Sequence, residues 1–171
     1  MRYYNREREI AKLQEVRELS YNDHSRLTVV TGRRRIGKTR LINNAMGDEP
    51  FIYLFVGRKN EASLCASYRK EIATKLNLFV PSITSFQELF AFLMQQGETK
   101  KFTLVIDEFQ EFFNVNSSIY SDIQNIWDQY CGQDVQLLQF RGLKRLTLQL
   151  QFHNVYNRFQ HEEELRRGRS G

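Results

Sequence analysis

The feature that most constrains this chain is the segment TGRRRIGKTR, residues 31–40. Residues 32–39 match the pattern G-x-x-x-x-G-K-[ST] at every fixed position. The two glycines allow backbone angles that other residues avoid, so successive N–H groups can point inward at an anion. The segment lies between an apolar run, LTVVTG, and the helical pattern of KTRLINNAM. This context predicts a nucleotide phosphate loop (Walker A), and the alternative is an arginine-rich surface turn.

The predicted loop gives specific roles to its polar side chains. Lys38 is expected to reach the β- and γ-phosphates, and Thr39 to offer its hydroxyl to Mg²⁺. The helix that begins near Lys38 adds the positive end of its dipole. Bound phosphates would offset the repulsion among the arginines of the loop. Alternatively, the arginines face the sheet, an acidic partner or solvent. The expected nucleotide contacts are Gly32, Arg33, Arg34, Arg35, Ile36, Gly37, Lys38, Thr39 and Arg40.

A second apolar run ends in two adjacent acids. Residues 103–108 read TLVIDE, which fits a Walker B strand. In phosphate-loop proteins an Asp at such a strand end holds Mg²⁺, usually through water, and a following Glu can act as general base toward the attacking water. We therefore predict that Asp107 binds the metal and that Glu108 is catalytic together with Lys38. The alternative is a solvated pair of acids that ends a strand.

The same acids separate classes of nucleotide-binding proteins. A GTPase would carry an Asn-Lys-x-Asp motif, which this sequence lacks. A small-molecule kinase usually lacks the second acid and adds an arginine-rich lid. The pair therefore favours ATP hydrolysis coupled to mechanical or signalling work.

Strand-like and helix-like segments alternate along the chain. Helices are predicted over residues 5–19, 38–46, 61–78, 84–97 and 117–130, and strands over 27–32, 51–57 and the apolar part of 100–113. The helix over 84–97 carries a Thr84/Ser85 cap with Glu88 behind it. Ile119, Ile123, Ile126 and Trp127 are expected to point inward. The alternation predicts an α/β fold with three α/β/α layers, a mostly parallel sheet, and the nucleotide at the carboxyl ends of the strands.

Composition and charge limit the class of protein. The chain has 171 residues, 41% hydrophobic and 26% charged, which favours a single soluble globular domain. No apolar run approaches the ~20 residues that cross a bilayer, and the N-terminus lacks a signal-peptide pattern, so we expect no membrane partner and a cytoplasmic location. The net charge is +5, and residues 141–171, with seven Arg/Lys against three Glu, contribute +4 of it. The basic character therefore belongs to the tail, either as a solvated segment or as a nucleic-acid contact.

With these motifs, the sequence resembles the archaeal-type ATPase family, whose phosphate-loop ATPases are grouped with the AAA and STAND proteins. The matching stretches are YYNREREIAKLQEV, VVTGRRRIGKTRLI, LVIDEFQEFF and IWDQY, within residues 3–131. The resemblance implies a three-layer α/β/α ATPase domain. It also implies that Gly37, Lys38 and Thr39 bind phosphate and Mg²⁺, with Asp107 and Glu108 as the hydrolytic acids.

The chain departs from the family pattern after the last of these stretches. Family members continue into a strand that ends in Ser-Gly-Ser and senses the γ-phosphate, and here Gln139, Phe140 and Arg141 stand at that place. We therefore expect residues 1–134 to form the ATPase domain and residues 135–171 an atypical basic segment. That segment is either a truncated or frame-shifted remnant or a genuine addition.

These observations predict the ATP-binding domain of an Mg²⁺-dependent ATPase, with ATP and Mg²⁺ as its cofactors. One alternative is a nucleotide-binding-only module with negligible turnover, since no sensor, lid or arginine finger is identified. Another is a basic adaptor that contacts nucleic acid. Besides the nucleotide, the expected partners are a second copy of the chain or another protein, with nucleic acid supported only by the charge of the tail.

Overall fold

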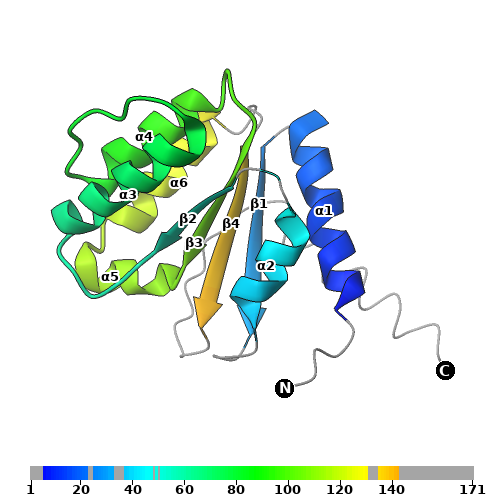
Figure 1. Cartoon of the computed structure of the whole chain (residues 1–171). Coiled ribbons are helices and arrows are strands. Elements are labelled where there is room, and N and C mark those ends of the chain that lie inside the picture. The colour runs from blue at the N-terminus through cyan, green and yellow to red at the C-terminus, as the bar shows by residue number, and fades with distance from the viewer. Residues whose placement is uncertain are drawn as a thin grey trace.

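The computed structural model describes residues 6–22, 25–32, 37–47, 49, 51–130 and 135–142, with the backbone alone at 27, 29, 31, 32 and 135–142. Its centre is a parallel sheet of four strands in the order β1-β4-β3-β2 (Figure 1). The strands are β1 Arg26–Gly32, β2 Phe51–Phe55, β3 Phe102–Asp107 and β4 Val135–Gly142. The predicted α/β fold with a parallel sheet is confirmed.

Helices cover both faces of this sheet. In Figure 1, α1 and α2 lie on one face and α3, α4 and α6 on the other, while α5 lies near the ends of β2 and β3. None of the helices in the described part of the chain is long and apolar enough to cross a membrane. The helices are α1 Glu7–Asn22, α2 Lys38–Met46, α3 Glu61–Leu76, α4 Phe86–Gln96, α5 Phe112–Val115 and α6 Ile119–Tyr130, with a short 3₁₀ turn, η1, at Phe109–Glu111.

Strand β4 lies in the middle of the sheet. Its backbone pairs with β1 on one side, where Gln139 is opposite Val29, and with β3 on the other, where Gln139 is opposite Ile106. The sheet thus includes residues beyond 134, the boundary expected from the loss of family pattern. It places one strand between the strand that leads into the phosphate loop and the strand that carries the acids.

The core lies in two layers because β3 is buried on both faces. Side chains alternate along a strand, so Leu104 and Ile106 join the larger cluster while Val105 joins the smaller one. The larger cluster includes the four residues of α6 that were predicted to face inward, all of them buried: Ile119, Ile123, Ile126 and Trp127. The smaller cluster joins α1 and α2 to Val105 through Leu13, Leu41, Ile42, Ala45 and Met46. A strand buried on both faces reads as a continuous apolar run, as residues 104–106 do.

Some predicted boundaries are confirmed, and others differ. Helix α1 continues to Asn22, past its predicted end at residue 19. Helix α2 has its predicted bounds, and the side chain of Ser85 caps α4 by accepting from the N–H of Glu88 at 3.2 Å. Helix α3 ends at Leu76 rather than at residue 78, because Asn77 adopts the left-handed conformation, with φ 48°. The strand predicted over 51–57 ends at Phe55, and that within 100–113 ends at Asp107. Residue 5, where the first helix was predicted to begin, lies outside the described residues.

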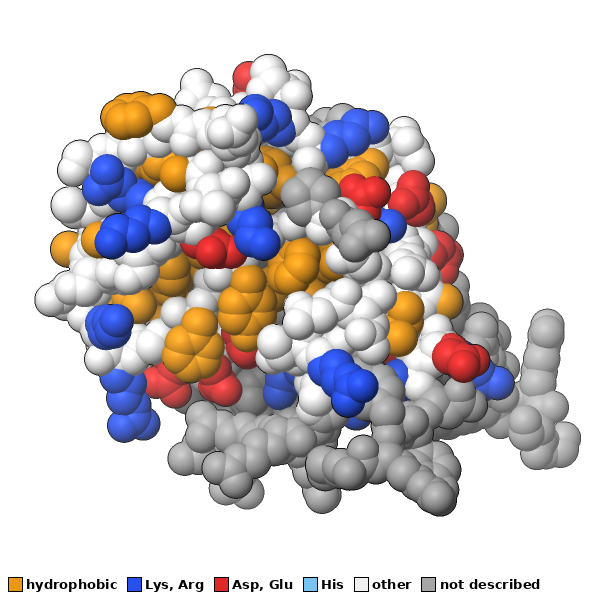
Figure 2. All heavy atoms as spheres, viewed as in Figure 1, with side chains coloured by type: hydrophobic (Ala, Val, Ile, Leu, Met, Phe, Trp, Pro, Cys, Tyr) orange, Lys and Arg blue, Asp and Glu red, His pale blue; other side chains and the backbone are white. Residues whose placement is uncertain are grey.

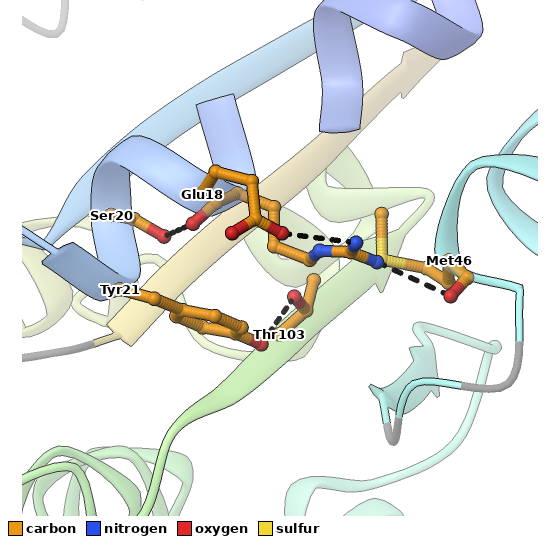
Figure 3. A network of polar contacts seen from close by, with 6 residues as sticks. Glu18, Ser20, Tyr21, Met46 and Thr103 are labelled. Atoms are coloured by element: carbon orange, nitrogen blue, oxygen red, sulfur yellow. Dashed lines mark hydrogen bonds and ion pairs between the residues drawn. The ribbon is translucent and has the colours of Figure 1, made fainter. Parts of the chain in front are cut away.

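Polar contacts fasten α1 to the rest of the molecule (Figure 3). The guanidinium group of Arg17 donates to the carbonyl oxygen of Met46 at 3.2 Å and to the carboxylate of Glu18 at 3.3 Å. The hydroxyl groups of Tyr21 and Thr103 lie 3.2 Å apart, and Thr103 is fully buried at the start of β3. Helix α1 is therefore tied both to the end of α2 and to the sheet, which holds α2 in place.

Candidate nucleotide-binding site

The predicted phosphate loop connects β1 to α2, and the structure describes its two ends. Gly37 immediately precedes α2 in the left-handed conformation, with φ 85° and ψ 30°. Its carbonyl oxygen accepts from the N–H of Leu41 at 2.9 Å, so the helix is formed from its first residue. A side chain at this φ would be strained, which explains the glycine. The predicted contacts Arg33, Arg34, Arg35 and Ile36 lie outside the described residues.

The pocket beside this helix start contains five of the residues predicted to act on the nucleotide and its metal ion. It has a volume of about 740 Å³ and lies where β2 and β3 end. The residues that line it are Gly37, Lys38, Thr39, Phe55, Val56, Gly57, Arg58, Asp107, Glu108 and Glu111. Arg40 is exposed in the first turn of α2 and is not among these lining residues, whereas Lys38, Thr39, Asp107 and Glu108 all are. The structure thus brings together the expected phosphate-binding and acidic groups.

The carboxylate of Asp107 is held by two donors. The hydroxyl group of Tyr53 donates to Oδ2 at 2.5 Å, and the backbone N–H of Glu108 donates to Oδ1 at 2.8 Å. Burial, followed by the hydrogen bond to Asp107, raises the pKa of Tyr53 from 10.0 to about 12, and the side chain of Thr39 opposes this rise. Tyr53 is therefore the protonated donor at neutral pH.

The sequence motifs do not point to Tyr53, because it lies inside an apolar strand 54 residues before Asp107 in the chain. The signal becomes visible only when β2 and β3 are paired. In that register Tyr53 is opposite Val105 and Phe55 is opposite Asp107. Since alternate side chains share a face, Tyr53, Val105 and Asp107 all lie on the face that α2 covers. A tyrosine two residues before the end of the neighbouring strand is thus in reach of the acid.

Glu108 has an unusual backbone for a glutamate. Its φ is 56° and its ψ is 37°, a left-handed conformation that costs about 1–2 kcal/mol for a residue with a side chain. Its carbonyl oxygen accepts from the N–H of Glu111 at 2.8 Å, which closes the 3₁₀ turn that follows β3. The side-chain amide of Gln110 donates to the Glu108 carboxylate. Both the main chain and the side chain of Glu108 are thus oriented by the turn after the strand.

The donors at the site suit magnesium. Thr39 and Asp107 both line the pocket, so a hydroxyl oxygen and a carboxylate are present there as ligands. Within the described ranges, no group of three or more His, Cys, Asp or Glu side chains is placed to hold a metal ion. Mg²⁺ commonly uses one or two protein oxygens and completes its shell with water and phosphate oxygens. The residues present therefore fit a magnesium ion held jointly with a nucleotide.

Sequence analysis also missed Arg58. It follows β2 and lines the pocket together with Lys38, and it borders a neighbouring hollow of about 470 Å³ that Lys59, Asn60 and Glu111 also line. No motif marks this arginine, because only the pairing of β2 with β3 brings it to the pocket. Elsewhere on the face shown in Figure 2, the described Lys and Arg side chains are dispersed rather than gathered in one patch.

Comparisons with known proteins agree with this fold. A family model described as an AAA domain matches residues 21–147. Among solved structures, the chain is similar to Cdc6p from Pyrobaculum aerophilum, with a TM-score of 0.56 and 19% identity over 83% of this chain and 40% of that one. It is also similar to Drosophila ORC bound to DNA, with a TM-score of 0.54 and 15% identity over 83% of this chain and 38% of that one. The chain is similar as well to C. elegans PCH-2, with a TM-score of 0.50 and 18% identity over 84% of this chain and 38% of that one.

These likenesses concern the fold, since the identities are all below 20%. The chain spans about two fifths of the length of each of these structures. A search of curated proteins by sequence found no match.

Proposed function

We propose that this chain, which belongs to the AAA domain family of phosphate-loop ATPases, binds ATP with Mg²⁺ and hydrolyses it to ADP and phosphate. The observation that carries the proposal is the shared pocket of Lys38, Thr39, Asp107 and Glu108. In this pocket Lys38 would bind phosphate, Asp107 would bind the metal ion, and Glu108 would accept a proton. This is the set of groups that ATP hydrolysis requires.

Binding of the polyphosphate rests on the start of α2. The first N–H groups of any α-helix have no partner within the helix itself, and the helix dipole favours an anion at this end. Lys38 adds a full positive charge from the first residue of the helix. Thr39 and Asp107 would hold Mg²⁺, Asp107 through water, and the bound ion would neutralise charge on the β- and γ-phosphate oxygens.

Hydrolysis rests on Glu108. Its carboxylate accepts a proton from a water molecule as the water oxygen bonds to the γ-phosphorus. The bond between that phosphorus and the oxygen bridging to the β-phosphate breaks, and ADP leaves with the electron pair. Gln110, which donates to the same carboxylate, restricts its orientation. Lys38 stabilises the charge that develops on the phosphate oxygens.

A second candidate function is nucleotide binding with negligible turnover. Residues 139–141 in β4 favour it, because they read Gln-Phe-Arg where members of the archaeal-type ATPase family, which the sequence resembles, have Ser-Gly-Ser. An arginine from another subunit is worth about 10³–10⁵ in rate in related reactions, so a chain without one can bind ATP and turn it over slowly. A second copy of the chain is therefore the partner we propose first.

Phosphate release by the purified protein, measured together with ATP affinity, tests these functions. Lys38→Ala should weaken ATP binding, and Glu108→Gln should retain binding but lose phosphate release. Glu88→Gln, which changes an exposed acid in α4, is the matched control and should behave like the wild type. Unchanged ATP affinity in Lys38→Ala would refute the site. Tight binding without phosphate release in the wild type would select the second candidate.

Nucleic acid is a further partner class, and it is proposed only for the tail. The Drosophila ORC structure to which the chain is similar is bound to DNA. Residues 141–171 carry seven Arg/Lys against three Glu. We also retain a cytoplasmic location as a proposal.

A further inference from the structure

We propose that Tyr53 is a positioning residue for the magnesium site, where its hydroxyl group orients the carboxylate of Asp107, one of the two expected protein ligands of the ion. The inference rests on the proposed function, because it concerns the ion that accompanies ATP. Neither the motifs nor the family resemblance assigns a role to this residue. It comes from β2, whereas the two ligands come from α2 and β3.

Tyr53 reaches Asp107 from the neighbouring strand. Its side chain lies on the sheet face that α2 covers, where it packs against the smaller apolar cluster. From there its hydroxyl group is 2.5 Å from Oδ2 of Asp107. The phenol group of β2 therefore holds the acid at the end of β3.

The hydrogen bonds of Asp107 leave room for metal-bound water. Tyr53 and the N–H of Glu108 each donate to a different oxygen, which fixes the plane of the group. An ionised carboxylate has about four lone-pair sites, so about two of them stay available for metal-bound water. Residues that orient a metal ligand in this way typically change metal affinity about 10–100-fold when they are removed.

Tyr53→Phe removes the hydroxyl group and keeps the ring, so it tests the hydrogen bonds without emptying the packing site. The readout is Mn²⁺ affinity, measured by electron paramagnetic resonance, of the protein saturated with a non-hydrolysable ATP analogue. We expect this affinity to fall about 10-fold or more in Tyr53→Phe. Affinity for the analogue in EDTA should stay within about twofold of the wild type, because Tyr53 acts on the ion rather than on the phosphate loop.

Tyr21→Phe is the matched control. It removes the hydroxyl of another tyrosine that bonds to a buried partner, Thr103, away from the pocket. Mn²⁺ affinity that is unchanged in Tyr53→Phe, or that falls equally in both variants, would overturn the inference. If the wild type binds no analogue, the proposed function itself fails. If the wild type binds both analogue and metal but the Mn²⁺ affinity of Tyr53→Phe is unchanged, the inference about Tyr53 is wrong and the proposed function still holds.

Discussion

Glu61 provides the sharpest test of how the helices beside the site are held. It is the first residue of α3, and its Oε1 accepts from the backbone N–H of Phe86 at 2.7 Å. Its Oε2 accepts from the side-chain amide of Asn116 at 3.0 Å. One carboxylate thus joins the start of α3, the start of α4 and the loop before α6. We predict that Glu61→Ala destabilises the protein by disconnecting these three segments.

The magnitude follows from the two bonds. A hydrogen bond to a charged group contributes about 1.5–3 kcal/mol, and Phe86 is a fully buried residue whose N–H belongs to the unpaired first turn of α4. Because Glu61 is itself partly exposed, solvent screening reduces the sum of the two, and we expect a loss of about 2–4 kcal/mol. The corresponding fall in Tm is about 4–16 °C for a chain of this size.

Urea unfolding at neutral pH measures this loss, with an unchanged m-value expected. Glu88→Ala is the matched control, because it also removes a carboxylate from the first turn of a helix. The control should cost no more than the helix-dipole contribution of about 0.3–1 kcal/mol. If Glu61→Ala costs no more than Glu88→Ala, the two cross-helix bonds do not stabilise the fold and the reasoning is refuted.

Two further predictions concern the core. Phe90→Ala should lower the free energy of unfolding in urea by about 3–5 kcal/mol, because Phe90 is fully buried and its ring centroid lies 6.2 Å from that of Phe86. Phe79 is 84% exposed, so Phe79→Ala should change this free energy by no more than about 0.5 kcal/mol. Burial raises the pKa of Cys65 from 9.0 to about 12, so the folded state keeps a proton that the unfolded chain loses. The resulting stability is fully present below pH 9 and is lost as the pH rises from 9 through 12. Cys65→Ala should therefore lose stability less steeply over that range in urea titrations, and an identical slope would contradict the burial argument.

Local features of the site could be predicted because they depend on neighbours in the chain. The pattern G-x-x-x-x-G-K-T between an apolar run and a helical run placed Gly37 and Lys38 at the start of α2. The Ser85 cap acts on a residue three positions away. The inward face of α6 follows from a repeat of three to four residues. In each case the interacting groups are only a few residues apart in the sequence.

Contacts between distant segments could not be predicted in this way. Glu61 caps α4 across 25 residues, and Tyr53 reaches Asp107 across 54. Both depend on which elements are neighbours in space, and hydrophobic periodicity does not encode that order. The same limit applies to β4, whose place between β1 and β3 extends the sheet past the expected boundary.

The chain's own sequence thus determined that a phosphate loop and a pair of strand-end acids exist, because backbone conformation and residue type at those positions are local properties. Tertiary structure alone decided that they share a pocket and that Tyr53 and Arg58 join them. The physical reason is that parallel strands pair through long crossovers, so the register that aligns their ends is set by packing of the helices against the whole sheet.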